Sequence, residues 1–244
     1  MKALIKVFTA VAILGAGMST AMAGDTPWNF ASSNSNDGKR IGNTLTYTSQ
    51  GETVKVNAYS GVNTIHEAIA WKNSSGLIAY QGCQQEKSNG ICEQIDDDSH
   101  AIDNSNGFDS LLFSFEQAVS ITGLSIGWIG NDSDISIAAF SSLPSLVGNT
   151  WDSIANSAIF KFNEANVVPA NYGADFGVEA KYWLISAYNN AFGGNFSKGN
   201  DSFKLLALTT HSADEEPPVD VPAPGTAILL TLGVGLIALR RRQK

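Results

Sequence analysis

Basic residues are scarce in this sequence, and their scarcity excludes a class of partners. The 244 residues include 15 Lys and Arg against 23 Asp and Glu. Six of the basic residues lie at the two ends, so residues 24–239 hold only nine and carry a formal charge of −14. Proteins that bind nucleic acid or anionic lipid need Lys and Arg to displace counterions from phosphates. We therefore exclude nucleic acid as a partner.

Histidine is also rare, which limits the catalytic arrangements available. His66, His100 and His211 are the only three, and none lies in a metalloprotease pair or a nucleophile motif. His100, Asp103 and Ser110 have the residue types of a triad, but triads are recognised by geometry and no Gly-x-Ser-x-Gly elbow is present. We predict no catalytic residues and no enzymatic activity.

Cysteine is limited to Cys83 and Cys92, in the stretch GCQQEKSNGICE. So close a pair predicts a local disulfide if the protein enters an oxidising compartment. The alternatives are a reduced pair and a metal site, but two thiolates alone do not complete tetrahedral zinc coordination.

The first 23 residues have the three parts of a secretory signal peptide. Lys2 and Lys6 supply the positive start, residues 7–18 the apolar stretch, and Ala21 and Ala23 the small-x-small cleavage site. We predict cleavage after Ala23 and export by the general secretory machinery. The roughly 190 residues that follow, up to the C-terminal tail, have a length typical of one domain with a substantial core.

Hydrophobic residues in the body recur with a period of two, which favours strands over helices. Gln50-Gly51 separates two alternating runs and predicts a hairpin. HEAIAWKN (66–73) also permits one short helix, whereas Pro144 and Gly148 argue against a long helix in 141–157. Strands are predicted at 43–49, 52–60, 66–72, 110–115, 119–129, 134–140, 157–162, 181–188 and 202–210. The expected fold of residues 24–211 is all-β: an antiparallel β-sandwich, with a jelly roll as one form of it.

The C-terminal segment reads as a linker followed by a short membrane helix. Residues 212–220 (SADEEPPVD) are acidic and proline-containing, and so predict an extended linker. Residues 223–239 carry no charge, and as a helix they would extend about 25 Å against a hydrocarbon core of about 30 Å. The following cluster, Arg240, Arg241 and Arg242, places the C-terminus in the cytoplasm.

Residues 221–244 resemble the PEP-CTERM sorting signal of exosortase-dependent bacterial proteins. The resemblance lies in Pro222-Ala223-Pro224, the apolar run and the arginine cluster, with Ala223 where the family most often has Glu. Segments 100–115, 125–140 and 181–209 are similar to parts of surface proteins that carry this signal. The resemblance implies transit through the inner membrane, processing by an exosortase, and a final place at the cell surface or in the extracellular matrix of a biofilm. It implies a location rather than a reaction.

Two groups of carboxylates are candidate calcium ligands. The first comprises Asp96, Asp97, Asp98, Asp103 and Asp109, with Asn104 among them, and the second comprises Asp132 and Asp134 beside Asn131. Hard oxygen ligands at alternate positions suit Ca²⁺, which takes six to eight of them. Neither an EF-hand pattern nor a nonapeptide repeat is present. The alternative is that these residues solubilise loops and form turns.

The tryptophans raise the question of sugar binding. Trp128 and Trp183 lie in apolar strands and are predicted to be in the core, which leaves Trp28, Trp71 and Trp151 as candidates for a stacking platform in a cleft. Three functions therefore stay open. The favoured one is a non-enzymatic surface or matrix protein, and the alternatives are a module that binds extracellular polysaccharide and an unrecognised polysaccharide hydrolase. The last would need two carboxylates roughly 5–10 Å apart across a cleft.

Overall fold

The computed structural model of the chain describes residues 24–31, 41–81, 101–168, 172–173 and 175–212. These residues are mostly β-strands, which confirms the predicted all-β class. The predicted signal peptide, the two cysteines, the linker and the C-terminal sorting signal all lie outside the described residues. Within the described part of the chain, neither helical segment has the length and apolar character that crossing a bilayer requires.

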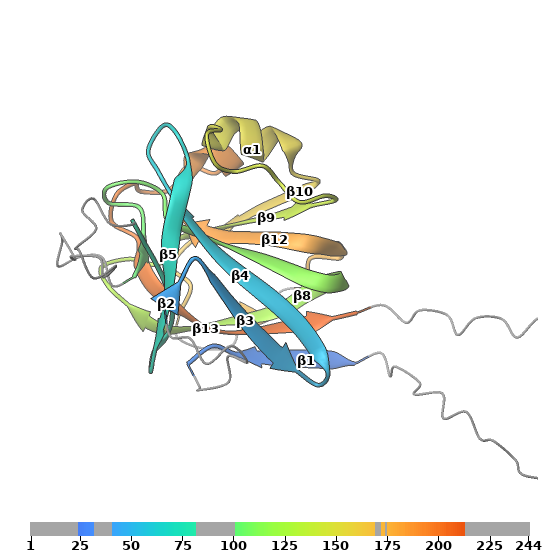
Figure 1. Ribbon diagram of the computed structural model, residues 1–244. Coiled ribbons are helices and arrows are strands. Elements are labelled where there is room, and N and C mark those ends of the chain that lie inside the picture. The colour runs from blue at the N-terminus through green and yellow to red at the C-terminus, as the bar shows by residue number, and fades with distance from the viewer. Residues whose placement is uncertain (1–23, 32–40, 82–100, 169–171, 174, 213–244) are drawn as a thin grey trace, which may run out of the picture. The chain divides into compact units, whose positions relative to one another are not determined.

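The described elements are thirteen strands, one short α-helix and one turn of 3₁₀-helix (Figure 1). In chain order they are β1 (Asp25–Asn29), β2 (Ile41–Gly42), β3 (Thr44–Ser49), β4 (Glu52–Ser60), β5 (His66–Asn73), β6 (Gly76–Gln81), β7 (Ile102–Asp103), β8 (Ser110–Ile129), β9 (Ile135–Phe140), α1 (Trp151–Ser157), β10 (Phe160–Glu164), β11 (Tyr172–Gly173), β12 (Ala180–Ala187), η1 (Asn190–Phe192) and β13 (Ser202–His211).

Each of the nine predicted strands corresponds to a strand of the structure. Gln50 and Gly51 join β3 to β4 with φ values of 51° and 88°, as a two-residue hairpin turn requires. Residues 66–73 form β5, so the short-helix alternative for this segment is wrong. The runs at 110–115 and 119–129 are one continuous strand, β8. Strands β1 and β6 and the two-residue strands β2, β7 and β11 were not predicted, and β1 carries Pro27, a residue that strands accept mainly at sheet edges.

Strand β8 organises the sheet, whose main path runs β1-β13-β6-β5-β4-β8-β12-β9-β10. The first half of β8 pairs with β4 and β12, and its second half pairs with β13. At the edge of the sheet β1 lies antiparallel to β13, with Asp25 opposite His211 (Figure 1). The first and last described strands therefore begin and end side by side.

Apolar side chains cover both faces of β9, of β12 and of the first half of β8, which explains why these segments read as nearly continuous hydrophobic runs. On β9, Ile135, Ile137 and Ala139 face the main core, while Ala138 and Phe140 face a second cluster. That second cluster also contains Trp151 and Ile154 of α1, so the helix covers the outer face of these strands. Each strand here is buried on two sides and cannot show polar alternation.

Candidate metal centre and adjoining cleft

The tetrapeptide Gly-Asn-Asp-Ser occurs twice, at 130–133 and 199–202, and the structure places the two copies side by side. Asp132 and Asp201 form a parallel bridge between them. The Ser202 N–H donates to the Asp132 carbonyl at 3.0 Å, and the Gly130 N–H donates to the Ser202 carbonyl at 2.7 Å. This backbone pairing brings two aspartates together that are far apart in the sequence.

Asp134 completes a group of three carboxylates. Asp132, Asp134 and Asp201 each offer one oxygen, and the three oxygens lie within 4.8 Å of one another. Asp134 and Asp201 are buried, at 3% and 1% exposure, whereas Asp132 is half-buried. Ligands on opposite sides of Ca²⁺, each at 2.3–2.6 Å, would be about 4.6–5.2 Å apart, so the spacing suits one shared ion.

Hydrogen bonds hold the two buried carboxylates in place. Asp201 accepts from the Asp134 N–H at 2.9 Å through Oδ1 and from the Asn104 amide at 2.5 Å through Oδ2. Asp134 Oδ1 accepts from the Asn166 N–H at 2.7 Å. A carboxylate oxygen has two lone pairs, so each of these bonds leaves acceptor capacity for a cation.

Asn200 adds a further oxygen beside the group. Its amide nitrogen donates to Asp132 Oδ2 at 2.8 Å, which orients the side chain. Its own Oδ1 is buried and has no hydrogen-bond partner in the structure. Buried polar atoms are normally satisfied, and amide oxygens are among the ligands that Ca²⁺ accepts, so this oxygen is a candidate fourth ligand.

The carboxylate group lacks a compensating charge among the described residues, where no Lys, Arg or His forms an ion pair with it. Burial raises the pKa of Asp201 to about 6; Asp134 and Asp132 add to the rise, while hydrogen bonds from the Asp134 N–H and Asn104 oppose it. Burial, together with the charge of Asp132, also raises the pKa of Asp134, against the Asn166 hydrogen bond. A proton or a bound cation would relieve this repulsion.

The predicted calcium ligands separate into three sets. Asp132 and Asp134 come together with Asp201, which the sequence reading missed, although the repeated Gly-Asn-Asp-Ser would have been a signal for it. Asp103 and Asp109 are not in that group: Asp103 lines a neighbouring cleft, and Asp109 is buried at the start of β8. Asp96, Asp97 and Asp98 lie outside the described residues.

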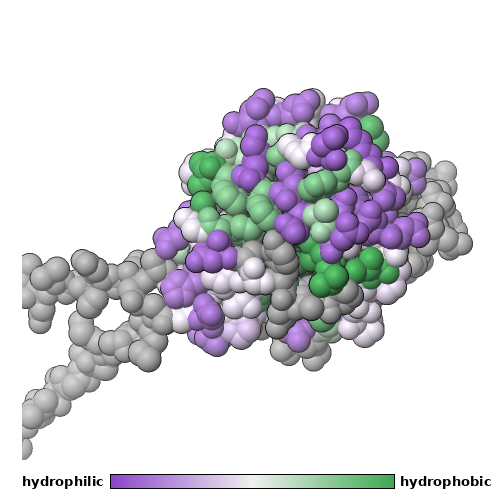
Figure 2. Space-filling model, turned by 180° about the vertical axis from the view of Figure 1, so that it is seen from behind, coloured by the Kyte–Doolittle hydropathy of each residue, from purple (hydrophilic) through white to green (hydrophobic). Residues whose placement is uncertain are grey.

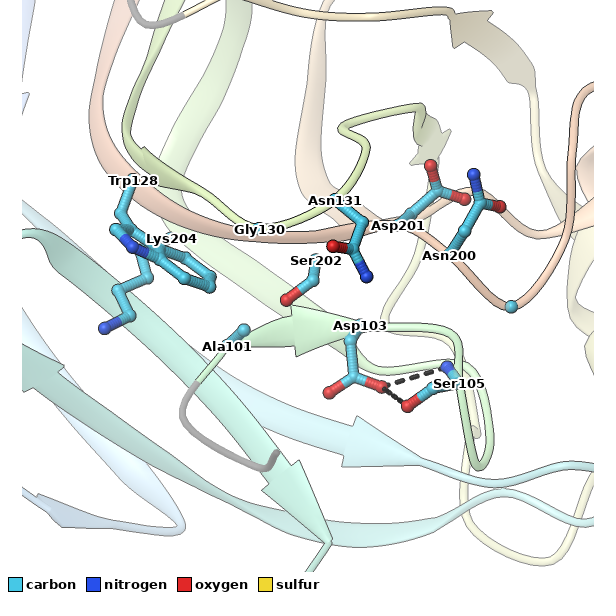
Figure 3. A pocket seen from close by; sticks show the side chains of 11 residues that line it. Ala101, Asp103, Ser105, Trp128, Gly130, Asn131, Asn200, Asp201, Ser202 and Lys204 are labelled. Atoms are coloured by element: carbon cyan, nitrogen blue, oxygen red, sulfur yellow. Dashed lines mark hydrogen bonds between the residues drawn. The ribbon is translucent and has the colours of Figure 1, made fainter. Parts of the chain in front are cut away.

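The cleft beside the carboxylate group has a volume of about 550 Å³. Figure 3 shows Trp128 and Lys204 at one end of it, Asn200 and Asp201 at the other, and Asp103 below them in this view. The Lys204 Nζ lies 4.8 Å from the centroid of the Trp128 ring. Trp128 is 41% exposed, and it is the one aromatic among the large exposed apolar side chains of the described residues.

A β-bulge turns Trp128 outward. Lys204 is opposite Trp128 and Leu205 is opposite Ile126, so Gly127 is an extra residue in β8. Before the bulge Ile126 faces the core, and after it Ile129 packs against the core while Trp128 points to solvent. The prediction that Trp128 lies in the core is therefore wrong, because it assumed unbroken alternation along this strand.

The other tryptophans do not form a surface platform. Trp183 is buried, as predicted, but Trp28 and Trp151 are buried too, which contradicts their candidacy. Their indole N–H groups donate inside the protein, from Trp28 to Thr210 Oγ1 at 2.9 Å and from Trp151 to the Gly61 carbonyl at 2.7 Å. Trp71 is half-buried and does not line the cleft.

The described histidines lie away from the cleft. His66 is exposed on β5, and His211 Nδ1 lies 3.3 Å from Asp25 Oδ1 at the sheet edge. Ser110 is buried and donates to the Tyr59 carbonyl. His100 lies outside the described residues, so the structure does not test a triad of His100, Asp103 and Ser110.

No family model matches the chain, and neither a curated protein nor a solved structure does. Function must therefore be inferred from the residues and the geometry of this chain.

Proposed function

We propose that this chain is an exported bacterial surface or extracellular-matrix protein without enzymatic activity, and that calcium stabilises its β-domain. One observation carries the calcium assignment: three carboxylate oxygens lie within 4.8 Å of one another, and two of the carboxylates are buried. Charges so placed need compensation, and a divalent cation with oxygen ligands supplies it.

The proposed location rests on the two ends of the sequence. The N-terminal pattern is typical of a signal peptide, and residues 221–244 resemble a PEP-CTERM signal, which implies an inner-membrane intermediate and an exosortase as partner. Mass spectrometry of the protein recovered from the cell surface tests this. A shortened C-terminus is expected, and an intact end at Lys244 would contradict processing.

We further propose that the sheet folds into two facing layers, as an antiparallel β-sandwich. In support, the rings of Trp28 on β1 and Phe115 on the first half of β8 pack edge to face at 5.7 Å. Their strands are separated along the main path of the sheet but share one core. Jelly-roll connectivity stays a prediction.

Thermal unfolding of the full chain, purified in a mild detergent, tests the calcium site. Millimolar calcium should raise the melting temperature relative to calcium-free buffer, because an ion that binds only the folded state stabilises it by about 2.7 kcal/mol at a hundredfold excess over Kd. Asp134→Asn should abolish the rise, since the amide can still accept from the Asn166 N–H but carries no charge.

The matched control is Asp175→Asn, which removes the same charge from an exposed site whose Oδ1 accepts from the Gly177 N–H. This variant should keep the full calcium response. An unchanged melt of the parent protein in calcium would rule the site out, and an equal loss of response in both variants would show a non-specific charge effect.

A polysaccharide hydrolase is the second candidate, because two carboxylates, Asp103 and Asp201, line the same cleft. However, Asp201 is buried, and each of its oxygens is held by one hydrogen bond, from the Asp134 N–H and from Asn104. That arrangement suits a carboxylate that coordinates a metal ion better than one that exchanges protons with a substrate. We expect no release of reducing ends from polysaccharide, and turnover that Asp103→Asn abolishes would favour the hydrolase.

A further inference from the structure

We propose that the cleft between β7, the end of β8 and the start of β13 binds a neutral saccharide, with the Trp128 ring stacked on the apolar face of a pyranose. The proposal goes beyond the calcium site and does not depend on it, although Asn200 and Asp201 belong to both. It rests on the outward orientation of the Trp128 side chain, the chemistry of the cleft walls and the charges in and behind the cleft.

The backbone of β8 sets the outward orientation of the Trp128 side chain. The bulge at Gly127 turns the ring away from the core, and bulges are over-represented where a side chain must be re-aimed at a site. A Cβ at Gly127 would overlap the carbonyl oxygen of Ser75, so position 127 of β8 has room only for glycine. The exposed indole is therefore a fixed feature of the strand.

Short polar groups make up most of the rest of the cleft wall. They are the carboxylates of Asp103 and Asp201, the amides of Asn131 and Asn200, and the hydroxyls of Ser105 and Ser202. Sites for drug-like apolar ligands are lined mainly by apolar side chains, which this cleft is not. Carboxylates accept hydrogen bonds and amides both donate and accept, so such a wall matches a ligand that is rich in hydroxyl groups.

Two glycines form part of the cleft wall, one of them beside the Trp128 ring. Gly130 and Gly199 contribute wall without side chains, and a Cβ at Gly130 would come within 3.1 Å of the Trp128 ring. A side chain at position 130 would therefore crowd the indole, and glycine leaves the ring edge uncovered there. A pyranose, with one apolar face and a rim of hydroxyls, fits an indole beside a polar wall.

Charge favours a neutral ligand over an acidic one. Among the described residues of the cleft lining, Lys204 is the one basic side chain, and its ammonium lies over one face of the Trp128 ring. The negative charges outnumber it: the lining contains Asp103 and Asp201, and Asp132 and Asp134 lie beside Asp201. Even with Ca²⁺ bound, the four carboxylates outweigh the ion and Lys204 by one negative charge, so an anionic polymer would meet net repulsion, whereas uncharged hydroxyls would not.

A glycan array tests the proposal, with the full chain purified in a detergent that has no sugar head group. The array carries neutral hexose and N-acetylhexosamine oligosaccharides beside uronic-acid oligosaccharides. We expect binding to neutral glycans, and binding about tenfold or more weaker for Trp128→Ala, as is typical of a central tryptophan. Trp128→Phe should retain part of the affinity.

Three variants provide the comparisons. Leu143→Ala removes an exposed apolar side chain, 61% accessible and outside the cleft lining, and should bind like the parent. Lys204→Gln should change neutral-glycan binding by no more than about threefold, because no ligand charge is recognised. Asp175→Asn, which removes a charge from an exposed residue outside the cleft lining, should also bind like the parent.

Three outcomes would overturn the inference. The first is no binding to any neutral glycan. The second is binding confined to uronic-acid glycans and lost in Lys204→Gln, which would show an anion site. The third is unchanged binding in Trp128→Ala when circular dichroism shows the variant is folded.

Discussion

Asp109 is a buried carboxyl group whose charge works against folding. It is 4% exposed, and its Oδ1 has no hydrogen-bond partner in the structure. Burial, and next the charge of Asp103, raise the pKa of Asp109 well above its ordinary value. At pH 7 ionisation of this group therefore costs free energy, which an uncharged amide would avoid.

Asp109→Asn should accordingly raise the free energy of unfolding at pH 7 by about 1–2 kcal/mol. At pH 4, where the carboxyl is already protonated, the variant and the parent should differ little. Urea denaturation at the two pH values measures both quantities. A loss of stability of equal size at pH 4 and pH 7 would show that the carboxylic acid is needed for its shape or hydrogen bonds.

Single residues show how far the sequence predicted the site. Asp132 and Asp134 stood out because acidic residues alternate there, but Asp201 is flanked by no second carboxylate. Only the parallel pairing of the two Gly-Asn-Asp-Ser copies brings Asp201 to them. Such a long-range backbone contact leaves no local pattern except the repeat itself.

At the scale of elements, the bulge in β8 makes a specific prediction for Gly127. Gly127→Ala would place a methyl group onto the Ser75 carbonyl oxygen, a backbone atom that cannot move cheaply. The substitution should lower the free energy of unfolding by about 1–3 kcal/mol, as overpacking does. It should also weaken saccharide binding, since relief of the overlap would displace the strand that carries Trp128.

Gly173→Ala is the matched control, because a Cβ there meets nothing within 4 Å and φ is not positive. Its stability should stay within about 0.5 kcal/mol of the parent. Chemical denaturation and tryptophan accessibility to acrylamide would report both effects. Equal stability of the two variants would contradict the close approach of β8 to Ser75.

Bulges also explain which parts of the fold the sequence could predict. The all-β class and nine strand positions followed from alternation and turn residues, because those signals are local. Alternation fails where β8 and β13 gain extra residues. In β8 the core-facing residues are at an odd position at Ile121, at even positions at Leu124 and Ile126, and at an odd position again at Ile129. Each shift exchanges the core-facing and solvent-facing positions of the strand, so a period of two could not predict that Trp128 points to solvent.

For the whole molecule, the raised pKa values predict how stability depends on pH. Asp201, Asp134 and Asp109 all bind protons more tightly in the folded state than in the unfolded chain. Stability from such groups is fully present below their ordinary pKa, near 4, and is lost as the pH rises toward the folded value. For Asp201 this window runs from about pH 4 to about pH 6.

Without calcium, the free energy of unfolding should fall between pH 4 and pH 7, by about 2–3 kcal/mol from Asp201 alone. Calcium binds the ionised carboxylates and competes with the protons, so it should flatten this fall. The calcium-induced rise in melting temperature should be largest at pH 7 and smallest at pH 4. Melts at pH 4, 5, 6 and 7, with and without calcium, measure it. A calcium response that is equal at every pH would show that the ion binds away from Asp132, Asp134 and Asp201.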